Sequence, residues 1–160
     1  MTSPVKNQVY TAEILGYSSE GLGIARIHGQ VVFVHDAIRG EVCDILILKV
    51  GKSAAFGKAV AWHTVSPHRR EPDCPYYRRC GGCAYRHMDY AEELWAKGQR
   101  VQDALTRLGG SHVKVEEILG ASHPLHYRNK SQYPVSPDGK VGFYRARTHC
   151  VTDLTACLIQ

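Results

Sequence analysis

Three cysteines lie within ten residues of one another near the middle of this 160-residue chain. Cys74, Cys80 and Cys83 follow the pattern C-x5-C-x2-C, and a pair of glycines separates the last two. Glycine has no side chain to crowd a tight loop, so this segment can direct two thiols toward one ion or cluster. Core packing alone does not explain three closely spaced cysteines, although it does explain a single one such as Cys43 in an apolar segment.

Disulfides and a reactive thiol are the less favoured interpretations of this cluster. The first ten residues contain no apolar segment typical of a signal peptide, which indicates a cytoplasmic protein whose thiols stay reduced. Arg78 and Arg79 would lower the pKa of a nearby thiol, but no neighbouring histidine stands out as its base. The cluster is therefore more typical of metal binding.

A metal held by three thiolates needs a fourth ligand. The sequence offers these candidates: Cys150, Cys157, His68, His87 and His149. Structural zinc sites usually take their ligands as two close couples of the form C-x2–4-C. A triplet with one remote cysteine suits a cubane cluster better, since each of four irons takes one thiolate. The spacing favours an iron–sulfur cluster and leaves zinc as the alternative.

Residues 8–63 predict a small β-barrel. Five segments read as short strands between glycine-containing turns: "QVYTAEIL", "GIARI", "QVVFV", "GEVCDILILKV" and "AAFGKAVAWH". The second and third are joined by His28-Gly29, and glycine at the second position favours a primed hairpin turn. We expect five antiparallel strands closed into an OB-like barrel, because closure removes the exposed sheet edges.

A helix is predicted after the cysteine segment. Asp89 is suited to the N-cap and Glu92 stands three residues later, a variant of the capping box. Gly109-Gly110 predicts the helix end. Apolar or small residues recur at spacings of three and four along one face: Leu94, Gly98, Val101, Leu105 and Leu108. We expect Gly98 to permit close packing, because glycine inside a helix otherwise costs about 1 kcal/mol relative to alanine.

Short strands are predicted in the last third of the chain. "VKVEEIL" reads as one strand, "YRNKSQYPV" and "KVGFYRART" as a hairpin around "SPDGK", and "HCVTDLTACLI" as a strand ending at Cys157. The expected organisation is a barrel over residues 1–63, a linker rich in proline and charge over 64–73, and a small α+β domain over 74–160. The fold class is thus mainly β with an α+β part.

Net charge is +5, which weakly favours a polyanionic partner. Residues 122–160 hold five of the basic residues and two of the acidic ones. No run of 18 apolar residues occurs, so the sequence predicts no transmembrane helix and no membrane partner.

Several motifs together resemble one family. C-x5-C-G-G-C is followed by Tyr127-Arg128-Asn129-Lys130, then by Gly142-Phe143-Tyr144, and finally by a late cysteine. This ordered set resembles the TRAM-domain RNA (uracil-5-)-methyltransferases of the 23S rRNA type, from about residue 8 to the last residue. The resemblance implies an RNA-binding TRAM barrel and a central domain that holds a [4Fe-4S] cluster through Cys74, Cys80, Cys83 and Cys157. Cys157 is the choice because Leu158-Ile159 follows it as in the family.

The resemblance also implies chemistry that these residues do not contain. The family transfers a methyl group from S-adenosylmethionine to uracil C5, after a cysteine has added to C6 of a flipped-out base. The sequence stops three residues after Cys157, and the family's catalytic cysteine, its base and its S-adenosylmethionine site all lie further on. We therefore expect an N-terminal portion without the methyltransferase domain, which binds RNA and a cluster but does not methylate.

RNA contacts are expected where cations and aromatic residues alternate, because cations neutralise phosphates and planar groups stack on unpaired bases. The predicted RNA-binding residues are Arg78, Arg79, Arg128, Lys130, Arg145 and Arg147. Barrel cations such as Arg26, Lys49, Lys52 and Lys58 are further candidates that a solvated surface explains equally well. The competing hypotheses are a free-standing RNA-binding module, a tRNA (uracil-5-)-methyltransferase and a zinc-stapled interaction protein; no DNA partner is expected.

Overall fold

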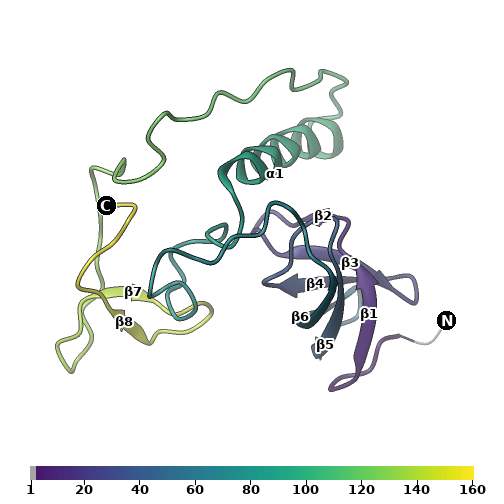
Figure 1. Ribbon diagram of the computed structural model, residues 1–160, viewed down its shortest axis with the longest axis horizontal. Helices are drawn as coiled ribbons and strands as arrows, with labels where there is room; N and C mark the ends of the chain where they lie inside the picture. The colour runs from purple at the N-terminus through teal and green to yellow at the C-terminus, as the bar shows by residue number, and fades with distance from the viewer. Residues whose placement is uncertain (1–2) are drawn as a thin grey trace.

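A computed structural model describes residues 3–160. A curled β-sheet lies at one side of the molecule, a two-stranded hairpin lies at the other, and helix α1 lies beside the connection between them (Figure 1). The strands are β1 (Val9–Glu13), β2 (Gly16–Tyr17), β3 (Gly23–Ile27), β4 (Gln30–His35), β5 (Val42–Val50), β6 (Ala54–Thr64), β7 (Gly142–Tyr144) and β8 (Val151–Asp153). The helices are α1 (Tyr90–Asp103) and a π-helical turn, η1 (Ala104–Leu108).

One bent strand closes the barrel. The sheet order is β1-β5-β6-β4-β3-β2, so the two outermost strands, β1 and β2, are consecutive in the chain. Only Ile14 and Leu15 separate them, and the Leu15 amide donates a hydrogen bond to the Ile24 carbonyl at 2.7 Å. Counting β1 and β2 as one strand gives the five that the sequence predicts. The mainly β, OB-like character of residues 8–63 is confirmed.

The predicted all-antiparallel pairing is wrong at one position. Strands β4 and β6 pair in parallel, with Phe33 opposite Phe56, while every other neighbouring pair in the sheet is antiparallel. The reason is geometric: strand direction cannot alternate all the way around a closed ring of five, so one neighbouring pair must run the same way.

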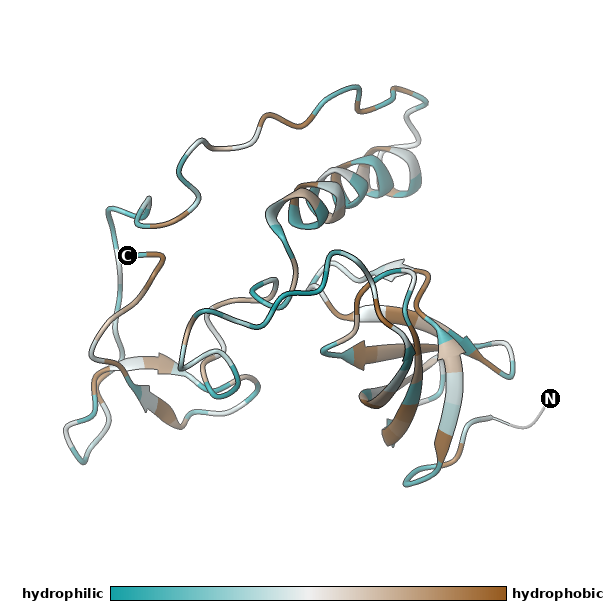
Figure 2. Ribbon diagram, viewed as in Figure 1, coloured by the Kyte–Doolittle hydropathy of each residue, from teal (hydrophilic) through white to brown (hydrophobic). Residues whose placement is uncertain are grey.

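The hydrophobic core lies inside the barrel. Alternate residues of β3, β4 and β5 point inward, and Ala25, Val32, Val34, Ile45 and Ile47 are completely buried. Figure 2 shows these strands as the most hydrophobic continuous part of the ribbon. Outside the barrel, the buried hydrophobic residues among those described are limited to Met88, Ala96 and Val151. Residues 74–160 therefore have little apolar core of their own.

Helix α1 begins as predicted. Asp89 is its N-cap and accepts a hydrogen bond from the Glu92 amide at 2.9 Å. Glu92 does not complete a capping box, because its carboxylate turns toward the barrel instead. Helical structure ends at Leu108, and Gly110 then adopts a positive φ of 60°, as expected of a glycine after a helix. Among residues 3–160, no helix is long and apolar enough to cross a membrane.

The predicted apolar stripe of α1 is only partly buried. Val101 is 48% exposed and Leu108 is 88% exposed, whereas Glu92, Ala96 and Gly98 are buried. A Cβ on Gly98 would lie 2.9 Å from Cγ1 of Ile118, so this glycine does permit the expected close packing.

Two of the predicted strands are absent from the part of the chain that the structure describes. Residues 113–119, "VKVEEIL", run alongside α1 without strand pairing, and residues 127–135 form only the isolated bridge between Val135 and Val141. The last predicted strand shortens to β8, three residues long. Strand-forming residues need a partner strand to hydrogen-bond with, and no neighbouring segment here provides one.

Candidate metal centre and RNA interface

One pocket gathers the four cysteines that the family resemblance selects. Cys74, Cys80 and Cys83 line it from the loop before α1, and Cys157 lines it from the segment after β8. The remaining candidate thiol, Cys150, is exposed and is not among the residues lining this pocket. The structure thus brings Cys83 and Cys157 to one pocket, although 73 residues lie between them in the sequence.

The glycine pair explains how the loop approaches the hairpin. The Gly81 amide donates a hydrogen bond to the Tyr144 carbonyl at 2.9 Å, and a Cβ on Gly81 would lie 2.8 Å from that same oxygen. A Cβ on Gly82 would lie 3.4 Å from the Phe143 ring. The Gly82 amide donates to Sγ of Cys80 at 3.3 Å. The loop therefore sits against β7 at a distance that only glycine allows at position 81.

Backbone hydrogen bonds hold the segment that carries Cys157. The amides of His126 and Arg128 donate to the carbonyls of Leu158 and Ile159 at 2.8 and 3.0 Å. Upstream, the hydroxyls of Tyr76 and Thr155 lie 2.7 Å apart and join this segment to the cysteine loop. Hydrogen bonds that do not involve the thiols therefore hold both the cysteine loop and the Cys157 segment in place.

Burial raises the pKa of the Cys80 and Cys83 thiols, and the neighbouring sulfurs raise it further. The Gly82 amide, which hydrogen-bonds to Cys80 Sγ, opposes this effect on the pKa of Cys80. Arg86 opposes the effect at Cys83. A metal ion bound here would displace the thiol protons, so metal binding would release protons and its affinity would rise with pH.

The four thiols line one pocket but do not converge on a point where they could hold one ion. Among residues 3–160, no three His, Cys, Asp or Glu side chains are placed to hold a single metal ion. A tetrahedral zinc site with Zn–S bonds of about 2.3 Å needs sulfurs roughly 3.8 Å apart. A cubane spreads its four thiolates further, since each binds a different iron. Arg86 and Arg128 also line the pocket, and the Arg86 guanidinium is paired with the carboxylate of Asp73.

The histidines that the sequence offered as ligands lie elsewhere. His87 is buried, and its Nδ1 lies 2.6 Å from the Tyr77 hydroxyl. His68 pairs with Asp89, and the His149 ring packs edge-on against Tyr144. None of the three lines the cysteine pocket.

Comparison with known proteins identifies the relatives of this fold. The TRAM domain model matches residues 5–60. The chain carries a TRAM domain and is homologous to RNA methyltransferases. Proteins named uncharacterized RNA methyltransferase are 47% identical over 158 residues in Clostridium tetani and 41% identical over 165 residues in Bacillus cereus. These alignments cover 97% and 100% of this chain but 34% and 36% of the relatives, so the chain spans about a third of their length.

A solved structure shares the arrangement of the TRAM barrel and the following segment. It is the Pyrococcus abyssi tRNA (uracil-54, C5)-methyltransferase in complex with S-adenosyl-L-homocysteine, with a TM-score of 0.58 and 19% identity. The match covers 92% of this chain and 32% of that one. At this identity the likeness concerns the fold.

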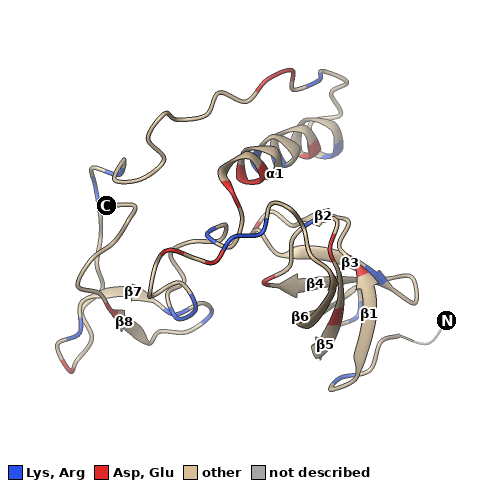
Figure 3. Ribbon diagram, viewed as in Figure 1, with Lys and Arg blue, Asp and Glu red and all other residues tan. Residues whose placement is uncertain are grey.

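Four of the six predicted RNA-binding residues have no ion pair or aromatic contact described with the TRAM barrel. Arg128 lines the cysteine pocket, whereas Lys130 is exposed in the unpaired segment that follows it. Arg79 and Arg145 are exposed on either side of the contact between the cysteine loop and the hairpin. Figure 3 shows basic positions in the cysteine loop and along this hairpin.

The other two predicted RNA-binding cations have partners in the TRAM barrel. Arg78 is 4.0 Å from Asp36 and 3.4 Å from Glu71. The guanidinium of Arg147 lies 5.2 Å from the centroid of the Phe56 ring. These contacts join the cysteine loop and the hairpin to the barrel, a role that sequence reasoning did not assign to either residue.

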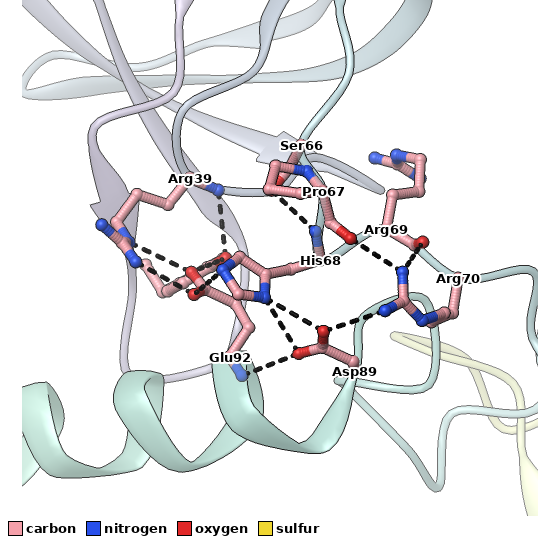
Figure 4. Close-up of polar contacts among 9 residues, drawn as sticks. Arg39, Ser66, Pro67, His68, Arg69, Arg70, Asp89 and Glu92 are labelled. Carbon is pink, nitrogen blue, oxygen red and sulfur yellow. Dashed lines mark hydrogen bonds and ion pairs between the residues drawn. The ribbon is translucent and has the colours of Figure 1, made fainter.

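A polar network between the TRAM barrel and α1 was also missed. Arg39 donates to both carboxylate oxygens of Glu92 (Figure 4). Glu92 also accepts a hydrogen bond from the Tyr17 hydroxyl at 2.8 Å. His68 and Arg70, from the connecting segment, contact the N-cap carboxylate of Asp89. The position of Glu92 after an N-cap signalled a capping box, and only the folded chain shows the competing partner.

Proposed function

We propose that these residues form the RNA-binding and [4Fe-4S]-binding part of an S-adenosylmethionine-dependent 23S rRNA (uracil-5-)-methyltransferase that forms 5-methyluridine. The observation that carries this proposal is the convergence of Cys74, Cys80, Cys83 and Cys157 on one pocket, in a chain that carries a TRAM domain. The relatives named RNA methyltransferase support the reaction class.

The cluster has a structural role in this proposal. When bound, it supplies four iron–thiolate bonds that fasten the Cys74–Cys83 loop to the segment of Cys157. Residues 74–160 bury few hydrophobic side chains, so a bound cofactor is a suitable source of folding free energy there. Zinc is the alternative, and metal analysis distinguishes the two.

RNA binding would use the exposed cations near this centre, chiefly Arg79, Lys130 and Arg145. Each phosphate contact contributes a salt-dependent part of the affinity. Methyl transfer requires a nucleophile for C6, a base and an S-adenosylmethionine site, and we assign none of these to residues 3–160. We expect this chain alone to bind RNA without methylating it, in a reducing cytoplasmic setting.

The test has a binding part and a genetic part. Anaerobically purified protein is titrated with 23S rRNA fragments, with tRNA and with duplex DNA of equal length at fixed salt. We expect the 23S rRNA fragments to bind most tightly; equal binding to DNA would contradict the proposal. In the source organism, deletion of the gene should remove one 5-methyluridine from 23S rRNA, as measured by mass spectrometry of nuclease digests. Loss from tRNA instead would support the tRNA alternative.

A further inference from the structure

Two aromatic rings lie side by side on the outer surface of the TRAM barrel. Phe33 of β4 is directly opposite Phe56 of β6, and their ring centroids are 5.4 Å apart. The residues that alternate with them, Val32, Val34 and Ala55, point inward and are completely buried. Because side chains alternate across a strand, both phenylalanines face outward, and both are only half-buried. They are not part of the barrel core.

A cation from the other part of the chain reaches this aromatic pair. Arg147 belongs to the loop between β7 and β8, and its guanidinium carbon lies 5.2 Å from the Phe56 centroid. Arg147 is also close enough to His35 for its charge to add to the effect of burial in lowering the pKa of that imidazole. The ring pair therefore lies where barrel and hairpin meet.

Two lysines flank the rings on the same face. Lys49 of β5 is directly opposite Phe56 in the antiparallel ladder, so both side chains leave the same side of the sheet. Lys58 follows Phe56 by two positions and is opposite His35. Both lysines are exposed. The nearby carboxylate of Asp36 is engaged by Arg69 and Arg78, and Glu20 is a second carboxylate that acts on His35. Lys49, Lys58 and Arg147 together still leave this surface net positive.

We propose that Phe33, Phe56 and Arg147 form a stacking site for one unpaired nucleobase of RNA, with Lys49 and Lys58 binding the adjacent phosphates. This inference rests on the proposed RNA-binding function and adds a site to it. Partly exposed aromatic rings between cations are how many proteins hold single-stranded nucleic acid, since every base has a flat face and every linkage a negative charge. A surface that bound an apolar protein segment would not need the flanking lysines.

The site joins the two parts of the chain. In the free protein the Arg147 side chain covers the Phe56 ring. In the complex, a base inserts between the Phe56 ring and the Arg147 guanidinium. The ring then stacks on one face of the base and the planar guanidinium stacks on the other. Bound RNA would therefore contact the TRAM barrel and the β7–β8 loop through one nucleotide.

The test measures binding of a fluorescent single-stranded RNA of about ten nucleotides by anisotropy, using the full chain with its metal. Stacking of one base is worth about 1–3 kcal/mol, so Phe33→Leu and Phe56→Leu should each weaken binding by roughly 5- to 150-fold. Val60→Ala is the matched control, because Val60 is an exposed apolar residue on the same strand, β6. Lys49→Ala and Lys58→Ala should each reduce the slope of log affinity against log salt by about 0.7.

A second variant keeps the test decisive if the leucine variants fold poorly. Phe56→Trp should bind RNA as tightly as the parent, and its fluorescence should be quenched when a base stacks on it. Unchanged emission on saturation with RNA would overturn the proposed site. Parent protein that binds RNA while both leucine variants bind equally well would also overturn it. Parent protein that does not bind RNA would instead contradict the proposed function.

Discussion

Glu92 of helix α1 and Arg39 of the TRAM barrel form a two-point ion pair, with Nε to Oε1 at 3.1 Å and Nη2 to Oε2 at 3.0 Å (Figure 4). The Glu92 side chain is 1% exposed and that of Arg39 is 36% exposed. The Arg39 guanidinium also lies 3.8 Å from the centroid of the Trp95 ring of α1. These contacts of Arg39 hold helix α1 against the TRAM barrel.

Replacing Arg39 by alanine should release the helix. A buried carboxylate that loses its partner typically destabilises a protein by 3–5 kcal/mol, and about 3 kcal/mol is expected here because Arg39 is partly exposed. The control is Lys97→Ala, which breaks the surface pair with Glu93 and should cost only about 0.3–0.5 kcal/mol. Urea unfolding measures both. Equal destabilisation by the two variants would contradict a special role for the Arg39–Glu92 pair.

Stability should fall in acid because of Glu41. This carboxylate is fully buried, and burial alone would raise its pKa. Hydrogen bonds from Arg69 and from the amides of Ile38 and Ser66 outweigh burial and hold the pKa below the ordinary value of 4.5. The unfolded chain therefore binds a proton first, so this contribution is present above about pH 4.5 and is lost as pH falls through the folded pKa.

The matching variant is Glu41→Gln. It should be less stable than the parent at neutral pH, because Arg69 then loses its two-point ion pair with Glu41 and keeps only the longer ion pair with Asp36, at 3.7 Å. Its free energy of unfolding should also depend less on pH below 4.5. Urea titrations at a series of pH values test both points; a variant with the parent's acid dependence would show that other groups cause it.

Gly81→Ala should disturb the cysteine loop. The added methyl group would lie 2.8 Å from the Tyr144 carbonyl and 2.9 Å from the Ala146 amide, and backbone atoms cannot move aside cheaply. Overpacking of this kind typically costs about 1–3 kcal/mol. Gly16→Ala is the control, since nothing lies within 4 Å of its added Cβ. Metal content and melting temperature are measured together. Wild-type values for Gly81→Ala would show that the loop does not need this close contact.

Cys157→Ser should abolish the metal centre, while Cys150→Ser should leave it intact. Only Cys157 lines the pocket with the other three thiols, although both residues follow the hairpin strand β7. Iron and zinc content of the two purified variants decides the matter. Metal loss from Cys150→Ser alone would mean that the fourth ligand was assigned to the wrong residue.

The barrel was predictable because each of its signals is local. Alternating apolar residues and the His28-Gly29 turn define its strands, and Asp89 defines the start of α1. The parallel β4–β6 pair was missed because it follows from closure of the whole ring and not from any one segment. Residues 113–119 have strand-like composition, but composition does not reveal whether a partner strand lies alongside.

The spacing of the cysteines predicted only part of the cysteine site. The C-x5-C-x2-C pattern predicts three ligands of a site, and family resemblance alone favoured Cys157 over Cys150. In the structure Cys157 lines a pocket with these three cysteines, and its role as a ligand stays a prediction. Contacts between distant segments, such as Arg39 with Glu92 and Arg147 with Phe56, leave no pattern in the sequence. They depend on how the barrel and the hairpin are placed.

Iron, acid-labile sulfide and zinc content of anaerobically purified protein tests the central claim most directly. A cubane bound by Cys74, Cys80, Cys83 and Cys157 predicts about four irons and four sulfides per chain, with a brown colour. Cys157→Ser prepared in parallel should lose them. One zinc per chain with no iron or sulfide would contradict the proposal that this pocket holds a [4Fe-4S] cluster.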